Sequence, residues 1–323
     1  MTGWGLTVPL EGVPLPALRE LLPEIRRAGF DEVWSSEVAG YDGLTPLTLA
    51  AAWDPDVRLG TAILPVYTRG PGLLAMSAAA LADAAPGRFT LGLGASSPAI
   101  VEQWNGMAFT EPLARSREVL RFLRRALAGE KVDAPALGVA GFRLERPPAT
   151  PPPIVLAALR PQMLRLAGSE ADGVVLNWLA ATDVARCTAE LGPAGGERTV
   201  AARVFVCPTA DADLARGIAR RMIAAYLTVP AYAAFHRWLG RGERLRPMAQ
   251  AWAAGDRRGA LAAIPDDVVD ELVVHGPPAA CREHVQRYAD AGVDVPVVAL
   301  VPTPELADPA TLVATLRAIG GGR

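Results

Sequence analysis

The chain has 323 residues, of which 51% are hydrophobic and 20% are charged. This length and composition suit one large α/β unit, since barrels of alternating strands and helices reach this size as single domains. A formal net charge of −2 points to neither a nucleic acid nor an anionic membrane surface as a partner.

Cysteines and histidines are few and scattered. Cys187, Cys207 and Cys281 form no CxxC pair, and the three histidines form no HExxH pair, so we expect neither a disulfide framework nor a metal site. The chain contains no run of about 18 apolar residues, as a membrane span would require. Its first ten residues lack the pattern of a signal peptide. We therefore expect a cytoplasmic protein.

Short apolar strands alternate with longer helical patterns along the chain. Strands are predicted at residues 5–10, 31–37, 57–66, 88–94, 153–159, 173–179, 200–207 and 296–301. The pattern over residues 15–28 predicts a helix that Pro23 would kink or split. A second helix is predicted to begin at Pro112 and to end near Gly129, which follows the usual placement of proline and glycine at helix ends.

Eight strands with intervening helices predict a (β/α)8 TIM barrel with insertions rather than a doubly wound sheet. Residues 132–152 are proline-rich and loop-like, whereas residues 211–275 are long and mostly helical in pattern. Both stretches are predicted to be insertions between barrel units. Since no linker divides the chain, we expect residues 1–323 to form a single domain.

Small residues end the fourth predicted strand, at the edge where barrels carry their active sites. Gly94, Ala95 and Ser96 lack bulk, so a flat ligand could approach the main chain there. The alternative is that Ser97, just before Pro98, only caps a helix. The spacing does not separate these two interpretations.

The fifth predicted strand ends in a second candidate stretch, Ala157, Ala158, Leu159 and Arg160. A helix beginning near Pro161 would direct its first amides at a phosphate, and Arg160 could add positive charge. The alternative is an ordinary strand–helix turn with a surface arginine.

Three further features have a functional and a structural interpretation. Glu37 ends the second strand near Tyr41, and could act as an acid, a base or a hydrogen-bond acceptor, or could simply be solvated. Trp104 could line a pocket or could only be packed. The basic stretch 237–247 is predicted to be a solvated loop, with the binding of an acidic cofactor tail as the alternative. The scattered histidines assemble no Ser-His-Asp triad.

Several stretches resemble the bacterial luciferase-like superfamily, specifically its F420-dependent oxidoreductase branch, where F420 is an 8-hydroxy-5-deazaflavin coenzyme. They cover most of residues 26–180 and the end of the chain, and residues 185–270 match least. The stretches are AGFDEVWSSEVAGYDGLTPLTLAAA, VRLGTAILPVYTRGPGLLAMSAAALADAAPGRFTLGLGASSPAIVEQWNG, PLARSREVLRFLRRALAGEKV, PIVLAALRPQMLRLAGSEADGVVLNWL and GPPAACREHVQRYADAGVD.

The resemblance implies a barrel that is dimeric or larger, with F420, or alternatively FMN, lying across the strand ends. Similar proteins carry a non-proline cis peptide in strand three, which falls here at Ala62–Ile63. The implied cofactor contacts are Ser36, Ala62, Ile63, Gly94, Ala95, Ser96, Ser97, Ala157, Ala158, Leu159, Arg160 and Asn177. Tyr41 and Trp104 are the implied substrate contacts.

The chain departs from some relatives at the proton-transfer positions. Ser36-Glu37 replaces an Asp-His pair, Tyr41 replaces a tryptophan, and Ser97 replaces an acidic residue, so sugar-phosphate dehydrogenase activity is not expected. The resemblance implies reversible hydride transfer between F420 and a small organic substrate, with Glu37 as the proton donor or acceptor. Relatives use alcohols, imines, activated alkenes or pterins. The alternatives are a reduced-FMN-dependent monooxygenase and a non-catalytic flavin-binding protein.

Overall fold

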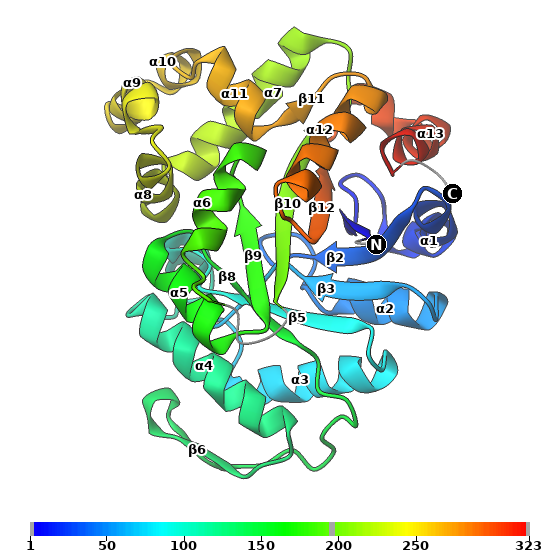
Figure 1. Ribbon diagram of the computed structural model, residues 1–323, viewed down its shortest axis with the longest axis vertical. Coiled ribbons are helices and arrows are strands. Elements are labelled where there is room, and N and C mark those ends of the chain that lie inside the picture. Colours follow the sequence, from blue (N-terminus) through cyan, green and yellow to red (C-terminus); the bar gives the residue numbers. More distant parts are fainter. Residues whose placement is uncertain (1–2, 194–197, 321–323) are drawn as a thin grey trace.

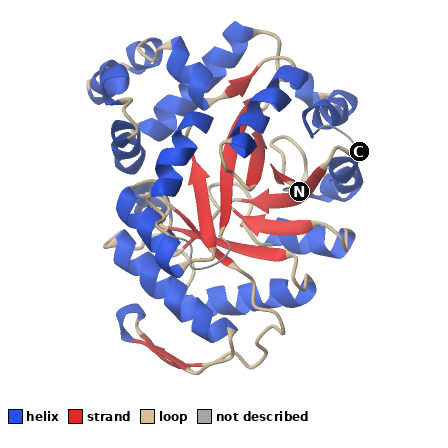
Figure 2. Cartoon of the chain, viewed as in Figure 1, coloured by secondary structure: helices blue, strands red, loops and turns tan. Residues whose placement is uncertain are grey.

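Parallel strands close into a barrel inside a ring of helices in the computed structural model, which describes residues 3–193 and 198–320 (Figures 1 and 2). Pairing of β10 with both β9 and β12 closes the ring of eight, which confirms the predicted (β/α)8 barrel. In order around the barrel, the strands are β1 (Trp4–Thr7), β2 (Phe30–Ser35), β3 (Arg58–Thr61), β5 (Phe89–Gly94), β8 (Ile154–Ala157), β9 (Gly173–Asn177), β10 (Thr199–Cys207) and β12 (Val295–Leu300).

The third predicted strand, residues 57–66, is not continuous, which corrects the sequence-based expectation. It divides into β3 and the two-residue β4 (Leu64–Pro65), and the peptide bond between Ala62 and Ile63 is cis. Both pieces pair in parallel with β5, so the interruption leaves the barrel closed. A short additional strand, β11 (Val274–His275), pairs with β10 outside the ring.

Helices cover the outside of the barrel, and Pro23 lies inside the first of them without splitting it. Within the described ranges, no helix is long and apolar enough to cross a membrane. The covering helices are α1 (Leu18–Arg27), α2 (Thr45–Trp53), α3 (Pro71–Ala84), α4 (Pro112–Leu127), α5 (Pro161–Glu170), α6 (Val184–Ala189), α12 (Pro278–Asp290) and α13 (Pro309–Gly320). Short 3-10 turns precede three of them, namely η1 (Leu15–Ala17), η4 (Ala181–Asp183) and η5 (Pro304–Ala307).

Both stretches expected as insertions lie between barrel elements. Residues 132–152 are not purely loop-like, because β6 (Val132–Ala134), η3 (Pro135–Leu137) and β7 (Val139–Phe142) form an antiparallel hairpin, seen at the lower edge of Figure 1. Strands of three and four residues are too short to leave an alternating pattern. Residues 211–275 are mostly helical as predicted, and their helices are α7 (Ala212–Leu227), α8 (Pro230–Trp238), α9 (Gly242–Ala253), α10 (Arg257–Ala262) and α11 (Asp266–Leu272).

The basic stretch 237–247 is not a solvated loop, since it comprises the end of α8 and the first half of α9. Arg241 is only 4% exposed. Its guanidinium lies 2.8 Å from Asp183 Oδ2 and 2.7 Å from Glu271 Oε2. The prediction of a solvated loop was wrong because the carboxylates that neutralise Arg241 come from distant parts of the chain and are not visible in the local sequence.

A tryptophan fills the interior of the barrel. Trp34 of β2 packs with apolar residues of β8, β9, β10 and β12, and its Nε1 donates a 2.9 Å hydrogen bond to Glu32. Glycine on the neighbouring strand makes this possible, because a Cβ at Gly60 would lie 2.4 Å from the ring. A Cβ at Gly5 would approach the same ring to 2.8 Å. These two glycines therefore provide the space that the indole occupies.

Gly60→Ala should lower the free energy of unfolding by about 1–3 kcal/mol, because the added methyl group overpacks a rigid ring. Urea unfolding followed by circular dichroism measures the change. Gly217→Ala is the matched control, since a Cβ there meets nothing within 4 Å in the middle of α7. The control should be stabilising by about 0.5–1 kcal/mol, as for glycine to alanine in a helix. Equal stability of the Gly60→Ala variant and the unaltered chain would contradict this account of the interior.

Candidate functional site

The carboxyl ends of the barrel strands form a mouth where side chains are half-buried above a fully buried interior. Ala157 and Asn177 end β8 and β9, and both are half-buried. Arg203 of β10 is in register with Asn177, so it stands at the same level. Side chains at alternate strand positions share a face, and Ala201 belongs to the interior cluster, so Arg203 also points into the barrel.

Ala62 and Ile63 provide an apolar floor on one side of this mouth. Their cis peptide bond lies at the position that the resemblance implies. The Ala62 amide donates to the Ser35 carbonyl at 2.6 Å, and the Glu37 amide donates to the Ile63 carbonyl at 3.3 Å. Both side chains are half-buried and pack against the interior cluster. The end of β2 therefore holds this segment with main-chain hydrogen bonds.

The glycines of β5 make room for this floor rather than leaving open space. A Cβ at Gly92 would lie 1.7 Å from the Thr61 carbonyl oxygen, and one at Gly94 would lie 2.8 Å from Ile63 Cγ1. The Thr61 hydroxyl also bridges to Gly92, donating to its carbonyl at 2.9 Å and accepting from its amide at 2.7 Å. Gly94 is itself buried, and the space beside it is filled by Ile63. Direct contact between Gly94 and a cofactor stays a prediction.

Ala95, Ser96 and Ser97 follow β5 and are half-buried at the rim. Ser96 has a φ of 65°, which lies in the left-handed region. The Ser97 hydroxyl accepts a 3.4 Å hydrogen bond from the Ile100 amide, so the capping interpretation of this residue is supported. The turn that it caps is the π-helical η2 (Ala99–Trp104), a form that often occurs at functional sites. Capping leaves the hydroxyl proton of Ser97 free to be donated.

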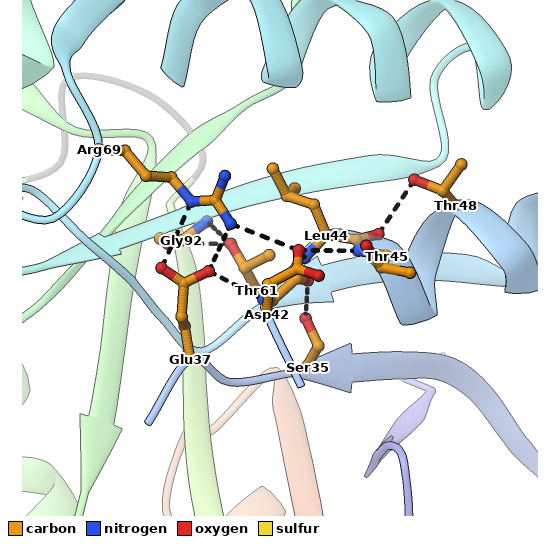
Figure 3. Close-up of polar contacts among 10 residues, drawn as sticks. Ser35, Glu37, Asp42, Leu44, Thr45, Thr48, Thr61, Arg69 and Gly92 are labelled. Atoms are coloured by element: carbon orange, nitrogen blue, oxygen red, sulfur yellow. Dashed lines mark hydrogen bonds and ion pairs between the residues drawn. The ribbon is translucent and has the colours of Figure 1, made fainter. Parts of the chain in front are cut away.

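Glu37 is an ion-pair partner and not a solvated carboxylate. Figure 3 shows its two oxygens facing Arg69, with Nη2 at 2.6 Å from Oε2 and Nε at 3.3 Å from Oε1. The Gly43 amide donates to Oε2 at 2.9 Å. Arg69 also reaches Asp42 Oδ1 at 3.3 Å. These contacts fasten the segment between β2 and α2 against the segment that follows β4.

Contacts within the same cluster lower the pKa of the Asp42 carboxyl group. Burial disfavours its charged form, but hydrogen bonds from Thr45 and Leu44 and the charge of Arg69 outweigh burial and hold its pKa below the usual value. The Ser35 hydroxyl donates to the Gly43 carbonyl nearby. Ser36, which lies between Ser35 and Glu37 in the chain, is half-buried. The rim next to Ala62 and Ile63 is therefore a connected polar network.

The end of β8 presents a helix start with no side-chain cap. Ala158 is buried, Leu159 is half-buried, and Arg160 is exposed immediately before α5. Among the residues that the structure describes, Arg160 has no ion pair, and no side chain caps the first amides of α5. This stretch keeps the features of the predicted phosphate region. Tyr41 and Trp104, the predicted substrate contacts, are 49% and 57% exposed, and their contact with a substrate stays a prediction.

A cluster of polar residues lies on the opposite side of the mouth, and sequence reasoning named only Asn177 in it and missed Arg203, Tyr226 and Tyr232. Asn177 Nδ2 donates to the Tyr232 hydroxyl at 3.1 Å, and the Arg203 guanidinium lies 4.9 Å from the centre of the Phe205 ring. Burial lowers the pKa of Arg203, although Tyr226 and Tyr232 oppose the shift. Burial raises the pKa of Tyr232 to about 12. The available signal was an arginine in the middle of the apolar strand VAARVFVC.

Three buried polar atoms at the mouth have no hydrogen-bond partner within residues 3–193 and 198–320. They are Thr7 Oγ1, Asn177 Oδ1 and Arg203 Nε. Thr7 ends β1 two residues after Gly5, whose position against Trp34 marks the interior face. Buried polar atoms are usually paired, so the unpaired atoms on β1, β9 and β10 are consistent with a ligand site at the mouth.

Comparisons with known proteins agree with this geometry. Residues 5–295 match the model of the luciferase-like monooxygenase family. A Mycobacterium tuberculosis protein that carries the name coenzyme F420-dependent oxidoreductase is 30% identical over 328 residues, which cover 91% of this chain and 93% of that protein. The 5,10-methylenetetrahydromethanopterin reductase of Methanolobus tindarius is 29% identical over 283 residues, which cover 82% of this chain and 84% of that protein.

A solved structure extends the comparison to the fold. The coenzyme F420-dependent tetrahydromethanopterin reductase of Methanopyrus kandleri superimposes with a TM-score of 0.79 at 21% identity. The match covers 99% of this chain and 98% of that one. The barrel and the elements outside it therefore share one architecture with that enzyme.

Proposed function

We propose that this chain, which belongs to the luciferase-like monooxygenase family, is an oxidoreductase that transfers a hydride between coenzyme F420 and a small organic substrate. Support for F420 comes from the names of relatives, one of them 30% identical over nine-tenths of this chain. Because the family is described as luciferase-like monooxygenases, a reduced-FMN-dependent monooxygenase is the alternative function. The observation that carries the proposal is the mouth itself, which combines an apolar floor with unpaired polar atoms.

The residues present fit a flat heterocycle with polar edges. Ala62, Ile63 and Ala157 offer half-buried apolar surface for a ring face. Thr7 and Asn177 offer unpaired oxygens that suit polar groups on the ring or on its side chain. A bound deazaflavin supplies a carbon that carries hydride and that reacts poorly with oxygen, so the protein has to contribute position and electrostatics. Because the cofactor would supply the hydride chemistry, such a site does not require a catalytic triad.

Each rim segment has a separate task in this proposal. Ile63, which Gly94 and Ala157 accommodate, supports the ring face. Ser96 and Ser97 line the side of the ring and the start of its side chain. The uncapped start of α5 directs amides at the phosphate, and Arg160 adds charge beside them. Together these segments would fix the reactive carbon toward the polar side of the mouth, where substrate enters.

Cofactor choice is the decisive measurement. The purified full-length chain should bind F420 with one site per chain in a fluorescence titration, and FMN at least about tenfold more weakly, a difference of about 1.4 kcal/mol. Oxygen consumption with reduced FMN should stay at background. Tight FMN binding together with rapid oxygen uptake would replace the proposal by the monooxygenase alternative. Stoichiometric F420 binding without turnover of any alcohol, imine, activated alkene or pterin would favour a non-catalytic binding protein.

Arg160→Gln should weaken F420 binding about tenfold, because one charge-assisted contact to the phosphate is lost, a contribution of about 1.5 kcal/mol. The deazaflavin fragment without the phosphate should bind the variant and the unaltered chain equally. Arg165→Gln is the control, since Arg165 lies on the same helix and pairs with Glu190 at 2.8 Å. A similar loss for the fragment and for F420 would place the effect of Arg160 away from the phosphate.

Glu37→Gln should lower kcat by about 10²–10⁴-fold if this carboxylate moves the substrate proton, with the Kd of F420 unchanged. Arg69→Gln is the comparison, because it removes the same ion pair and keeps the carboxylate. A proton-transfer role requires the Glu37 variant to be far more impaired than the Arg69 variant. Equal losses in both variants would show that Glu37 only fastens the rim.

A further inference from the structure

Arg203 occupies an unusual position for a charged side chain, inside a parallel strand and facing the interior of the barrel. Its neighbours on β10 are apolar, and its register partners on the adjoining strands are Asn177 and Val297. The side chain is not fully covered, so part of it can be reached from the mouth. A guanidinium thus stands on the side of the mouth opposite the apolar floor.

The charge of Arg203 is not compensated by the protein. Within the part of the chain that the structure describes, no carboxylate pairs with it, whereas Arg69 and Arg241 each pair with carboxylates. The groups that face it are the Phe205 ring and the phenols of Tyr226 and Tyr232. Arginine stays protonated even when burial disfavours its charge, so the site carries an unneutralised positive charge.

The hydrogen-bonding groups around Arg203 are arranged for an acceptor. Arg203 Nε has no partner among the described residues. The Tyr232 oxygen accepts from Asn177 Nδ2, which leaves its own proton to be donated. Burial keeps this phenol protonated by raising its pKa to about 12. The Arg203 Nε proton and the Tyr232 phenol proton are therefore both available to an electron-rich oxygen, while Tyr226 hydrogen-bonds to the rest of the guanidinium.

One positive charge fits a monoanion better than a phosphate. Arg203 is the charged group of this cluster, and the other donors are neutral. The planar fork of a guanidinium matches the two oxygens of a carboxylate. The half-buried apolar side chains of Ala62, Ile63 and Ala157 supply surface for the carbon chain next to the carboxylate. These features select a small organic acid.

We propose that Arg203 and Tyr232 form a subsite that binds a carboxylate of the substrate. The inference deepens the proposed function, on which the word substrate rests, and it names the substrate class as small carboxylic acids. The carboxylate binds on the polar side of the mouth, while the carbon to be reduced or oxidised extends toward the floor formed by Ala62 and Ile63.

Isothermal titration of the full-length chain with butanoate, butanamide and inorganic phosphate tests the subsite without F420. Butanoate should bind with a millimolar Kd, and butanamide should bind at least tenfold more weakly because it lacks the charge. Arg203→Gln should weaken butanoate binding at least tenfold. Arg203→Lys should keep part of the affinity, since it retains the charge without the fork. Arg165→Gln, which alters an arginine of α5 that pairs with Glu190, should bind butanoate as the unaltered chain does.

Three outcomes would overturn the proposal: no butanoate binding to the unaltered chain, equal butanoate binding by Arg203→Gln, or phosphate binding that is tighter than butanoate binding and that Arg203→Gln weakens. If Arg203→Gln fails to fold, Tyr232→Phe serves as the second variant and should weaken butanoate binding two- to tenfold, with unchanged affinity counting against the subsite. F420 titration of the same samples separates the two proposals. Butanoate binding without F420 binding would contradict only the proposed function, and the reverse result would contradict only the subsite.

Discussion

The close approach of the third strand segment to β5 shapes the mouth on which the proposed chemistry depends. Thr61 and Ile63 enter spaces that exist only because positions 92 and 94 carry no side chain. The Thr61 hydroxyl then joins the two strands through both main-chain groups of Gly92. Because Ile63 is fixed in this way, the apolar floor belongs to the rigid barrel and does not depend on a mobile loop.

This constraint also explains how the mouth comes to have two unlike sides. The floor segment is held by main-chain hydrogen bonds from the end of β2, and the ion pair between Glu37 and Arg69 fastens the rim outside it. Across the barrel, Asn177 ends β9, and Arg203 stands beside it in the middle of β10, where α7 and α8 bring Tyr226 and Tyr232 over them. A planar ligand would meet apolar atoms on one face and hydrogen-bonding groups on the other.

The helices between β10 and β12 therefore do more than extend the fold. Their apolar side chains form a second core, which includes Trp178, Phe205 and Ala299 from the barrel strand ends. Burial of this core places the two tyrosines beside Arg203. The polar side therefore combines Asn177 and Arg203 of the barrel strands with tyrosines from residues 211–275, which lie outside the ring of strands.

The sequence by itself determined the eight strands, most of the helices and the identification of the barrel, because strand and helix patterns are local. The resemblance also located the cis peptide at Ala62–Ile63, which the structure has. Strands as short as those of the β6–β7 hairpin left no such pattern. Local pattern likewise could not show that residue 69 neutralises Glu37, 32 positions away.

Tertiary structure alone decided what the chemically important residues face. Register between β9 and β10 placed Arg203 beside Asn177, and strand alternation turned it toward the interior. In the folded chain, Ile63 fills the space beside Gly94, where the sequence had predicted room for a ligand. The physical reason is that a side chain's partners depend on which strands close against one another, and closure of the barrel joins segments far apart in the chain.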